Sequence, residues 1–394
     1  MAKLRLLTFT TLFPNREQPN HGIFVENRLR HLVATGEAES TVLAPVPFFL
    51  SGAEAFGRWG TYARVPALER RHGLVVHHPR FPAIPRIGMN LSAFLLYQAS
   101  RRAVRRLLAQ GQRFDAIDAH YLYPDGVAAV RLGAEFGLPV VLTARGSDVT
   151  QFPDHPTPRR LIRDAVARAA AVITVSAGLR AALLHLGVPE GKVTVLRNGV
   201  DTQTFRPIDR EAARAALGIT GPTLISVGAL IERKRHHLII GALAGLPEFH
   251  LLIVGEGPER ASLAALADRL GLAARVRLLG EQPHTGMPHY YSAADLSVLA
   301  SSREGWANVL LESMACGTPV VASDIPGNGE VVQERAAGLI VAANTSDGIA
   351  AAVRDLWADP PARAATRAYA ERFGWEATSR GQLELFRRVL EATR

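Results

Sequence analysis

Short apolar runs rich in β-branched residues alternate along the chain with longer stretches of helical periodicity. In the first half the apolar runs fall at residues 4–9, 41–43, 74–76, 116–118, 140–143, 172–175 and 193–196, and in the second half at 223–227, 250–254, 276–279, 296–299, 319–322 and 338–341. Helical patterns lie between them, among others at 159–170, 178–186, 259–270 and 306–316. Strands that are apolar throughout and alternate with helices are typical of parallel sheets covered on both faces. The pattern predicts an α/β protein with two doubly wound domains, whose ligand lies where strand carboxyl ends face a cleft.

Two segments interrupt this alternation. The stretch 201–207 separates the two halves and indicates a domain boundary there. Residues 45–90 carry six prolines and scattered aromatic residues, with little periodicity. Because so long an excursion in a compact domain is usually functional or disordered, we expect an ordered lid or an acceptor-binding loop.

Composition narrows the class of protein. The 394 residues include one cysteine, Cys316, which excludes a disulfide scaffold or a cysteine-rich zinc module. The low cysteine content leads us to expect a cytoplasmic protein. No run approaches the ~18 apolar residues needed to cross a bilayer, so we expect no membrane span. The net charge is +9, and residues 1–205 hold 25 of the 45 basic but only 15 of the 36 acidic residues. The first half therefore favours an anionic surface or substrate.

Several catalytic signatures are absent from the sequence. It contains no Walker A loop, no His-Glu-x-x-His, no Cys-x-x-Cys and no Gly-x-Ser-x-Gly. Gly255-Glu-Gly257 follows an expected strand and begins like a dinucleotide fingerprint, but Pro258 intrudes and Arg260 replaces the third glycine. A tight strand-to-helix turn explains these glycines better than a nicotinamide site.

The most informative stretch is 301–321, which runs from a strand end through a polar loop into a helix. Glu304 lies in the loop, whereas Glu312 lies two turns inside an apolar helix and must find partners or be protonated. Sugar hydroxyls, such as a ribose diol, would satisfy both oxygens of Glu312. The helix start, with Gly305, Asn308 and Val309, offers N–H groups and a positive dipole end to a phosphate. By spacing alone, one solvated and one structural glutamate would explain the pair equally well.

These glutamates resemble the paired-glutamate signature of the family 4 retaining glycosyltransferases. That family has the GT-B fold of two Rossmann-like domains facing across a cleft, and the resemblance extends over nearly the whole chain. Further similar segments are 226–234, 254–258, 290–295 and 198–201. Phe373-Gly-Trp375 looks like the start of the family's C-terminal helix, which crosses back onto the first domain. The resemblance implies an acceptor domain at 1–204, a donor domain at 205–372 and that helix at 373–394.

The resemblance also implies roles for residues of the second half. Glu304 would orient the donor sugar and stabilise its developing positive charge. Lys234, with Arg233 beside it, would neutralise the donor diphosphate. The family often has arginine where this chain has Ala229, and Arg233 is the candidate to replace it. A solvated charge run is the alternative for these cations.

In the first half the resemblance points to two loops. Gly22 would approach the donor phosphates through its backbone. His120 aligns with a histidine that approaches the donor sugar, although a loop-capping histidine is the alternative. Arg145 replaces a frequent histidine and would bind an anionic acceptor or the phosphates. Asp148 would be an acceptor ligand or a helix cap.

Residues 90–110 predict one helix with an apolar start and a cluster of arginines at 101, 102, 105 and 106. At 100° per residue, Arg102, Arg105 and Arg106 share a side with Leu91 and Phe94. Such a face suits an anionic membrane surface, which would make the protein peripheral on the inner membrane face, or a polyprenyl-phosphate or charged-saccharide acceptor. An ordinary surface helix is the alternative.

The function expected from these observations is retaining transfer of a sugar from a nucleotide-diphosphate donor to a saccharide or lipid-linked acceptor. Cell-surface polysaccharide or glycolipid assembly is the expected setting. No Asp-x-Asp pair is placed to hold a cation, so we expect no metal and no cofactor. A nucleotide-sugar epimerase or a phosphorylase remains an alternative. A basic nucleic-acid-binding protein is disfavoured, because no binding module is recognisable, and we expect no nucleic-acid partner.

Overall fold

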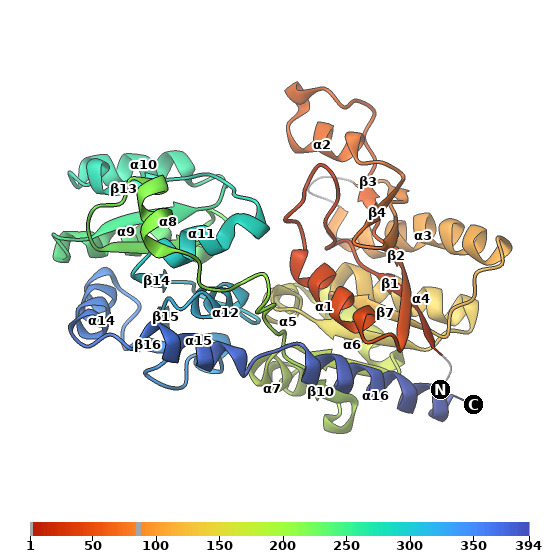
Figure 1. Cartoon of the computed structure of the whole chain (residues 1–394). Helices are drawn as coiled ribbons and strands as arrows, with labels where there is room; N and C mark the ends of the chain where they lie inside the picture. Colours follow the sequence, from red (N-terminus) through yellow and green to blue (C-terminus); the bar gives the residue numbers. More distant parts are fainter. Residues whose placement is uncertain (1–2, 84–87, 394) are drawn as a thin grey trace. The chain divides into compact units, whose positions relative to one another are not determined.

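The computed structural model describes residues 3–83 and 88–393 and divides the chain into two compact units. Unit 1 comprises Met1–Arg197 with Glu376–Arg394, and unit 2 comprises Asn198–Trp375 (Figure 1). The divisions fall at 197/198 and 375/376, where the sequence placed them at 204/205 and 372/373.

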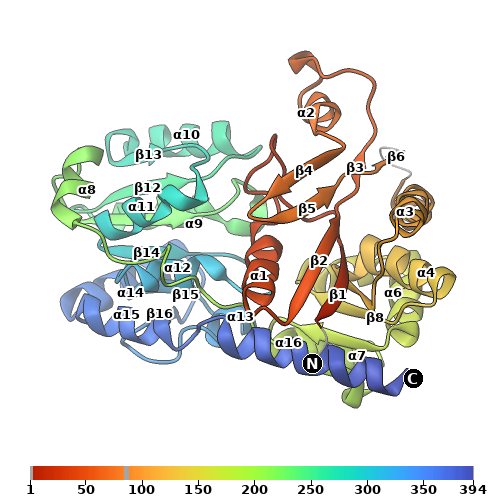
Figure 2. The same cartoon turned by 45° about the vertical axis from the view of Figure 1, so that its right-hand side comes forward.

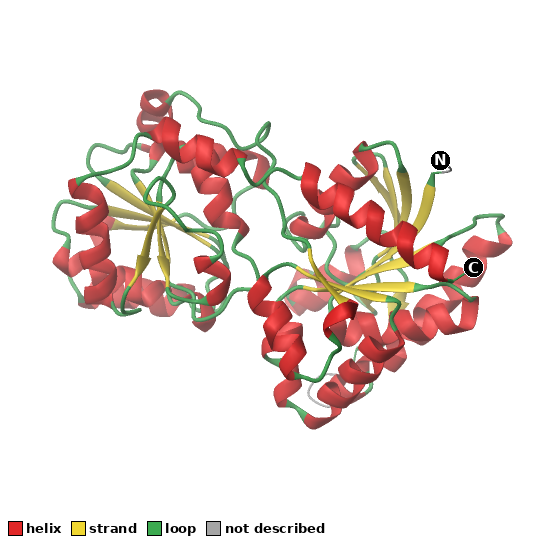
Figure 3. Cartoon of the chain, turned by 90° about the horizontal axis from the view of Figure 1, so that it is seen from below, coloured by secondary structure: helices red, strands yellow, loops and turns green. Residues whose placement is uncertain are grey.

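Unit 1 is built on an eight-stranded sheet in the order β10-β9-β8-β7-β1-β2-β5-β4. Its strands are β1 Leu4–Phe9, β2 Ala38–Leu43, β4 Leu68–Arg71, β5 Leu74–His77, β7 Ala116–His120, β8 Val140–Ala144, β9 Ala171–Thr174 and β10 Val193–Val195. All neighbours pair in parallel except β4 and β5. Helices lie on both faces of the sheet (Figure 3): α1 Ile23–Ala34, α3 Ser92–Ala109, α4 Val127–Phe136, α5 Ser147–Thr150, α6 Pro156–Arg168, α7 Ala177–His185 and α16 Glu376–Ala392.

The stretch 45–90 holds more regular structure than the sequence indicated. It contains β3 Val46–Pro47, α2 Arg58–Arg64, β4, β5 and β6 Arg80–Phe81, while residues 84–87 lie outside the described part. Rings of Phe49, Trp59 and Tyr62 pack with centroids 5.8 and 5.9 Å apart, and Arg80 donates to carbonyls at the end of α2. This aromatic cluster gives the segment a small core of its own, which the sequence pattern did not reveal; Figure 2 shows α2 near its tip.

Unit 2 has a six-stranded, wholly parallel sheet in the order β13-β12-β11-β14-β15-β16. Its strands are β11 Thr223–Val227, β12 His250–Val254, β13 Val276–Leu278, β14 Leu296–Leu299, β15 Val320–Ser323 and β16 Gly338–Val341. Its helices are α8 Arg210–Leu217, α9 His236–Ala242, α10 Arg260–Arg269, α11 Met287–Ala293, α12 Asn308–Ala315, α13 Pro326–Gly329, α14 Ser346–Ala358 and α15 Arg363–Glu371. This strand order is that of the Rossmann fold, so the expected α/β class is confirmed.

The C-terminal helix α16 is part of unit 1, because it completes that unit's core. Leu383 and Phe386 are buried in the same apolar cluster as strand β1 and helix α1. Gln382, directly before Leu383 and 1 % exposed, accepts a 2.9 Å hydrogen bond from Arg28 Nε and donates one of 3.0 Å to Asp118 Oδ2. The side-chain amide of Gln382 therefore links the buried Arg28 of α1 and the buried Asp118 of β7 to helix α16.

We expect Gln382→Leu to lower the free energy of unfolding of unit 1 by about 2–4 kcal/mol. The substitution leaves a buried guanidinium and a buried carboxylate each short of one hydrogen bond. Urea denaturation measures the change. Glu384→Leu, at an exposed position of the same helix, is the matched control and should change stability by no more than about 0.5 kcal/mol. Equal effects of the two variants would contradict the role given to Gln382.

Candidate functional site

The topological switch point of unit 2 lies between β11 and β14. These strands are neighbours in the sheet, but the chain proceeds from them toward opposite edges. In doubly wound sheets ligands bind at the carboxyl ends of the strands beside this point. The loop after β11 carries Arg233 and Lys234, and the loop after β14 carries Glu304.

The three charged side chains meet directly. Lys234 Nζ lies 2.7 Å from Glu304 Oε1, and Arg233 Nη1 lies 3.2 Å from Glu304 Oε2 and 3.0 Å from the carbonyl oxygen of Arg303. Gly228 has φ +155°, and a Cβ there would lie 3.1 Å from the Lys234 side chain. The glycine therefore lets the lysine cross close to the strand end and reach the carboxylate.

The Glu304 carboxylate is held ionised by its neighbours. Burial alone would raise its pKa, but Lys234 and Arg233 outweigh burial and hold the pKa below its usual range. The exposed fractions of the side chains are 10 % for Glu304, 12 % for Lys234 and 31 % for Arg233. Two cations and one anion leave this cluster with a net positive charge at the edge where a ligand is expected.

Helix α12 begins immediately beyond this cluster. Its N-cap residue is Ala307, whose side chain cannot accept a hydrogen bond from the first turn. Gly305 is buried, whereas Asn308 and Val309 are half-buried, and Asn308 Oδ1 accepts a 3.3 Å hydrogen bond from Asn198. An N-terminus without a side-chain cap leaves its amides and the positive end of its dipole to attract an anion.

Glu312 already has protein partners for both of its oxygens. His284 Nε2 lies 3.0 Å from Oε1, and the Tyr291 hydroxyl donates to Oε2 at 3.3 Å. Burial, followed by the charge of Glu312, raises the pKa of Tyr291 well above its usual value, so this hydroxyl stays a donor. The sequence missed His284 and Tyr291, since nothing in their spacing links them to Glu312.

The glycines at 255 and 257 serve packing. A Cβ on Gly255 would lie 1.9 Å from the carbonyl oxygen of Gly228, and one on Gly257 would lie 2.4 Å from that of Leu230. The turn after β12 thus presses against the loop after β11. This close approach agrees with the tight turn expected from the sequence.

In unit 1 the switch point lies between β1 and β7, and Gly22 belongs to the loop after β1. Gly22 has φ +70°, and a Cβ there would lie 2.3 Å from the backbone of Leu12, so only glycine fits. The same loop is tied to the segment after β7, because the backbone N–H and the hydroxyl of Thr11 both donate to the Asp125 carboxylate. Burial raises the pKa of Asp125 to about 7.

His120 lies at the end of β7, 1 % exposed, inside a charged network. Its Nδ1 accepts a 2.6 Å hydrogen bond from Arg145 Nη2, and its Nε2 lies 3.4 Å from Asp118 Oδ2. Burial is the largest cause that lowers its pKa to about 4, and Arg145 adds to it, so the ring is neutral with its proton on Nε2. Both nitrogens thus face protein groups, and its assignment to the donor sugar remains a prediction.

Arg145 and Asp148 have different surroundings. The Arg145 guanidinium packs over the ring of Phe24 at 5.4 Å, and burial lowers its pKa to about 9. Asp148 is fully buried and accepts hydrogen bonds from the backbone N–H groups of Leu122, Arg145 and Gly146 at 2.7–3.1 Å. The N-cap position of α5 is held by Gly146, so Asp148 is not that cap, and its role as an acceptor ligand remains a prediction.

The structure thus gathers the candidate residues into one group in each unit. Unit 2 brings together Arg233, Lys234, Glu304 and the start of α12, while Glu312 lies two turns further along that helix. Within residues 3–83 and 88–393, no group of three or more His, Cys, Asp or Glu side chains is placed to hold a metal ion. Sequence reasoning missed Asp118 and Asp125, because their charged and polar partners come from distant parts of the chain.

We expect Asp125→Asn to change how the stability of unit 1 depends on pH. Between pH 4 and 7 the folded protein keeps a proton on Asp125 that the unfolded chain has released. Because the folded state binds this extra proton, the contribution of Asp125 to the free energy of unfolding falls as the pH rises. The free energy of unfolding of the native protein minus that of the variant should fall by up to about 4 kcal/mol over this range and level off above pH 7.

Urea titrations at several pH values measure this difference. Burial lowers the pKa of both His120 and His236 to about 4, which gives the opposite pH trend, but these contributions are common to both proteins and cancel. A difference that rises with pH would show that Asp125 is ionised in the folded state.

Comparison with known proteins places both units in known families. The family described as Glycosyltransferase Family 4 matches residues 25–204, and the one described as Glycosyl transferases group 1 matches residues 209–373. The chain is 37 % identical over 221 residues to a D-inositol 3-phosphate glycosyltransferase of Mycobacterium leprae. The matched region covers 52 % of this chain and 51 % of that protein. The chain thus spans about half the length of the curated relatives it matches.

Two solved structures share the fold over nearly the whole chain. Sucrose-phosphate synthase from Thermosynechococcus elongatus superimposes with a TM-score of 0.81 at 23 % identity, covering 99 % of this chain and 100 % of that one. HepE from Anabaena in complex with UDP-glucose gives a TM-score of 0.73 at 20 % identity, covering 98 % and 99 %. The chain belongs to the family 4 glycosyltransferases, with the GT-B fold.

Proposed function

We propose that the protein is a retaining glycosyltransferase that moves a sugar from a nucleotide-diphosphate donor bound to unit 2. The acceptor is a hydroxyl of a saccharide or lipid-linked molecule bound to unit 1, in cell-surface polysaccharide or glycolipid assembly. The observation that carries the proposal is the Glu304 carboxylate held between Lys234 and Arg233 at the switch point of unit 2. HepE, which has the same fold, is described in complex with UDP-glucose, which supports a nucleotide-sugar donor.

The charged cluster changes partners when the donor binds. Its diphosphate competes with Glu304 for Lys234 and Arg233, and the α12 N-terminus supplies further positive potential. Glu304, released from the cations, is then free to hydrogen-bond the donor sugar and to stabilise the positive charge that develops on its C1.

The chemical step exchanges one bond for another on the same face of the sugar. The bond from C1 to the diphosphate oxygen breaks, a bond from C1 to the acceptor oxygen forms, and the acceptor's proton passes to the departing diphosphate. Lys234, Arg233 and the α12 N-terminus stabilise the leaving diphosphate, so that no metal ion and no cofactor are required.

We expect two substitutions in this cluster to affect different quantities, one the rate of the chemical step and the other the affinity for the donor diphosphate. Glu304→Gln leaves both cations free for phosphate, so kcat should fall by about 100-fold or more, while the Kd for nucleoside diphosphate is unchanged or lower. Lys234→Ala removes a phosphate contact, so that Kd should rise by about tenfold. Steady-state kinetics and calorimetry measure the two effects. Arg335→Gln, an exposed cation of unit 2 paired with Asp355, is the control and should behave as wild type.

The same assays test the other parts of the proposal. Activity should persist in excess chelator, and NMR of the product should show the anomeric configuration of the donor. Strict dependence on a divalent cation or an inverted product would contradict metal-free retaining transfer. An isomerised free donor, or a requirement for inorganic phosphate, would indicate an epimerase or a phosphorylase instead.

We also propose that unit 1 carries an anionic membrane-binding surface. In the described part of the chain, seven of the ten exposed large apolar side chains lie between residues 48 and 94, among them Phe48 (50 % exposed), Leu50 (89 %) and Phe94 (46 %). On α3, Arg101 and Arg105 pair with Glu135 of α4, whereas Arg102 and Arg106 are exposed. Exposed aromatic and aliphatic groups and exposed arginines in the same unit suit the interface of an anionic bilayer. Among the residues described, no helix is long and apolar enough to span a membrane.

Vesicle co-sedimentation tests this surface. Wild type should bind vesicles containing anionic lipid, bind neutral vesicles weakly, and lose affinity as salt is raised. Phe48→Ser with Leu50→Ser, and separately Arg102→Gln with Arg106→Gln, should each weaken binding by about tenfold. Leu270→Ser, at an exposed apolar position of unit 2, is the control. Failure to bind either kind of vesicle would end the membrane proposal.

A further inference from the structure

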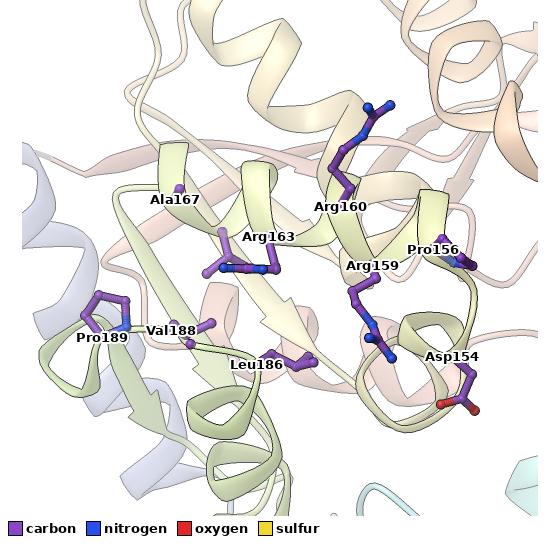
Figure 4. Close-up of a pocket in the computed structure, with 11 residues that line it drawn as sticks. Asp154, Pro156, Arg159, Arg160, Arg163, Ala167, Leu186, Val188 and Pro189 are labelled. Atoms are coloured by element: carbon purple, nitrogen blue, oxygen red, sulfur yellow. The ribbon is translucent and has the colours of Figure 1, made fainter.

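A groove on unit 1 has no role in the function proposed above. Helix α6 and the turn 186–189 that follows α7 line an open groove with a volume of about 570 Å³ (Figure 4). That volume lies within the range of small-molecule sites in proteins. The groove shares no residue with the charged cluster of unit 2 or with the network around His120.

One wall of the groove is basic. Arg159 and Arg163 lie one helical turn apart on α6 and line the groove with Arg160, while Asp154 is the one acidic lining residue. Figure 4 shows Arg160 extending away from the 186–189 turn. Arg159 Nε donates to the Pro153 carbonyl at 2.6 Å, which holds that side chain in place.

The Arg163 side chain extends from α6 toward the 186–189 turn. A Cβ on Gly187 would lie 3.9 Å from Arg163 Nη2, so the guanidinium sits close to the groove wall opposite its own helix. Neither Arg159 nor Arg163 forms an ion pair with any residue in the described ranges 3–83 and 88–393. These two guanidinium groups come from successive turns of α6 and have no carboxylate partner in those ranges, which makes the rim electrostatically suited to an anion.

The rest of the groove is aliphatic. Val166 and Val188 are buried at its base, and Leu186 and Pro189 line it further out. No aromatic side chain is among the lining residues, so the groove offers no ring on which a nucleotide base or a sugar would stack. The lining favours a ligand with one anionic end and an aliphatic body.

We propose that this α6–α7 groove binds an anionic amphiphile. Arg159 and Arg163 hold its phosphate head, and its aliphatic body covers Leu186 and Val188. Planar guanidinium groups bind phosphate through paired hydrogen bonds, and burial of the aliphatic body adds affinity that a free phosphate ion lacks. A free amphiphile and a lipid in a bilayer share this chemistry, and the test separates them.

The probe is farnesyl phosphate, kept below the concentration at which it forms micelles, with inorganic phosphate and farnesol as comparisons. Calorimetry on the full chain should show saturable binding of farnesyl phosphate and affinities at least about tenfold weaker for the other two. Arg159→Gln with Arg163→Gln should weaken farnesyl phosphate binding by about tenfold, and Leu186→Gln should also weaken it. Arg168→Gln removes a charge from the same helix outside the groove, where Arg168 pairs with Asp164, and should leave binding unchanged.

Several outcomes would overturn the proposal. Inorganic phosphate that binds as tightly as farnesyl phosphate would show a plain anion site, and an equal loss in Arg168→Gln would show attraction by bulk charge. Binding to vesicles that contain farnesyl phosphate, without binding of the dissolved compound, would assign the effect to a membrane surface. Nucleoside diphosphate binding to unit 2 should be the same in all these variants, so this test fails or succeeds independently of the proposed transfer reaction.

Discussion

Parallel strands must deliver their carboxyl ends to one edge of the sheet, and this constraint assembles the charged cluster of unit 2. Lys234 follows β11 and Glu304 follows β14, so residues 70 positions apart in sequence meet at 2.7 Å because their strands are neighbours. Each loop carries a charge that the other neutralises, which lets a carboxylate remain ionised although it is largely buried. The cluster retains an excess positive charge, so an anionic ligand can compete with the carboxylate for its two cations.

The corresponding edge of the unit 1 sheet differs, because its charged groups are more deeply buried than those of unit 2. There the charges of Arg28 and Asp118 are almost fully buried, and each depends on hydrogen bonds from within the unit. A buried charge that loses its partner is costly, so these groups fix the position of α16 through Gln382 and of the β7 end through His120. Because these hydrogen bonds come from within unit 1, the two charged groups position the elements around them. The two switch points therefore have the same topology, but the charges beside that of unit 1 are almost fully buried, whereas the cations of unit 2 are partly exposed.

The sequence was sufficient for features that depend on periodicity or on local backbone needs. Continuous apolar strands predicted both sheets, and the pattern of 90–110 predicted the helix observed at 92–109. The grouping of Arg233 and Lys234 with Glu304 could be anticipated only through the family resemblance. Contacts set by tertiary packing could not be anticipated. His284 and Tyr291 reach Glu312 from other elements, and Glu135 of α4 pairs with Arg105 of the expected basic face and with Arg101 beside it. Nor does any local pattern reveal Asp125, whose raised pKa results from burial beneath the β1 loop.

The positive charge of the first half divides into environments with different consequences. Arg28 and Arg145 are buried, where desolvation lowers their pKa values and their charge acts on neighbouring protein groups. Arg102 and Arg106 on α3, and Arg159 and Arg163 on α6, lie at the surface with no carboxylate partner in the described residues. Since salt screens exposed charges beyond about 8 Å at physiological ionic strength, each surface pair attracts only the anions close to it. The excess of basic residues is therefore divided between buried charges, which act on protein groups, and separate exposed pairs on α3 and α6.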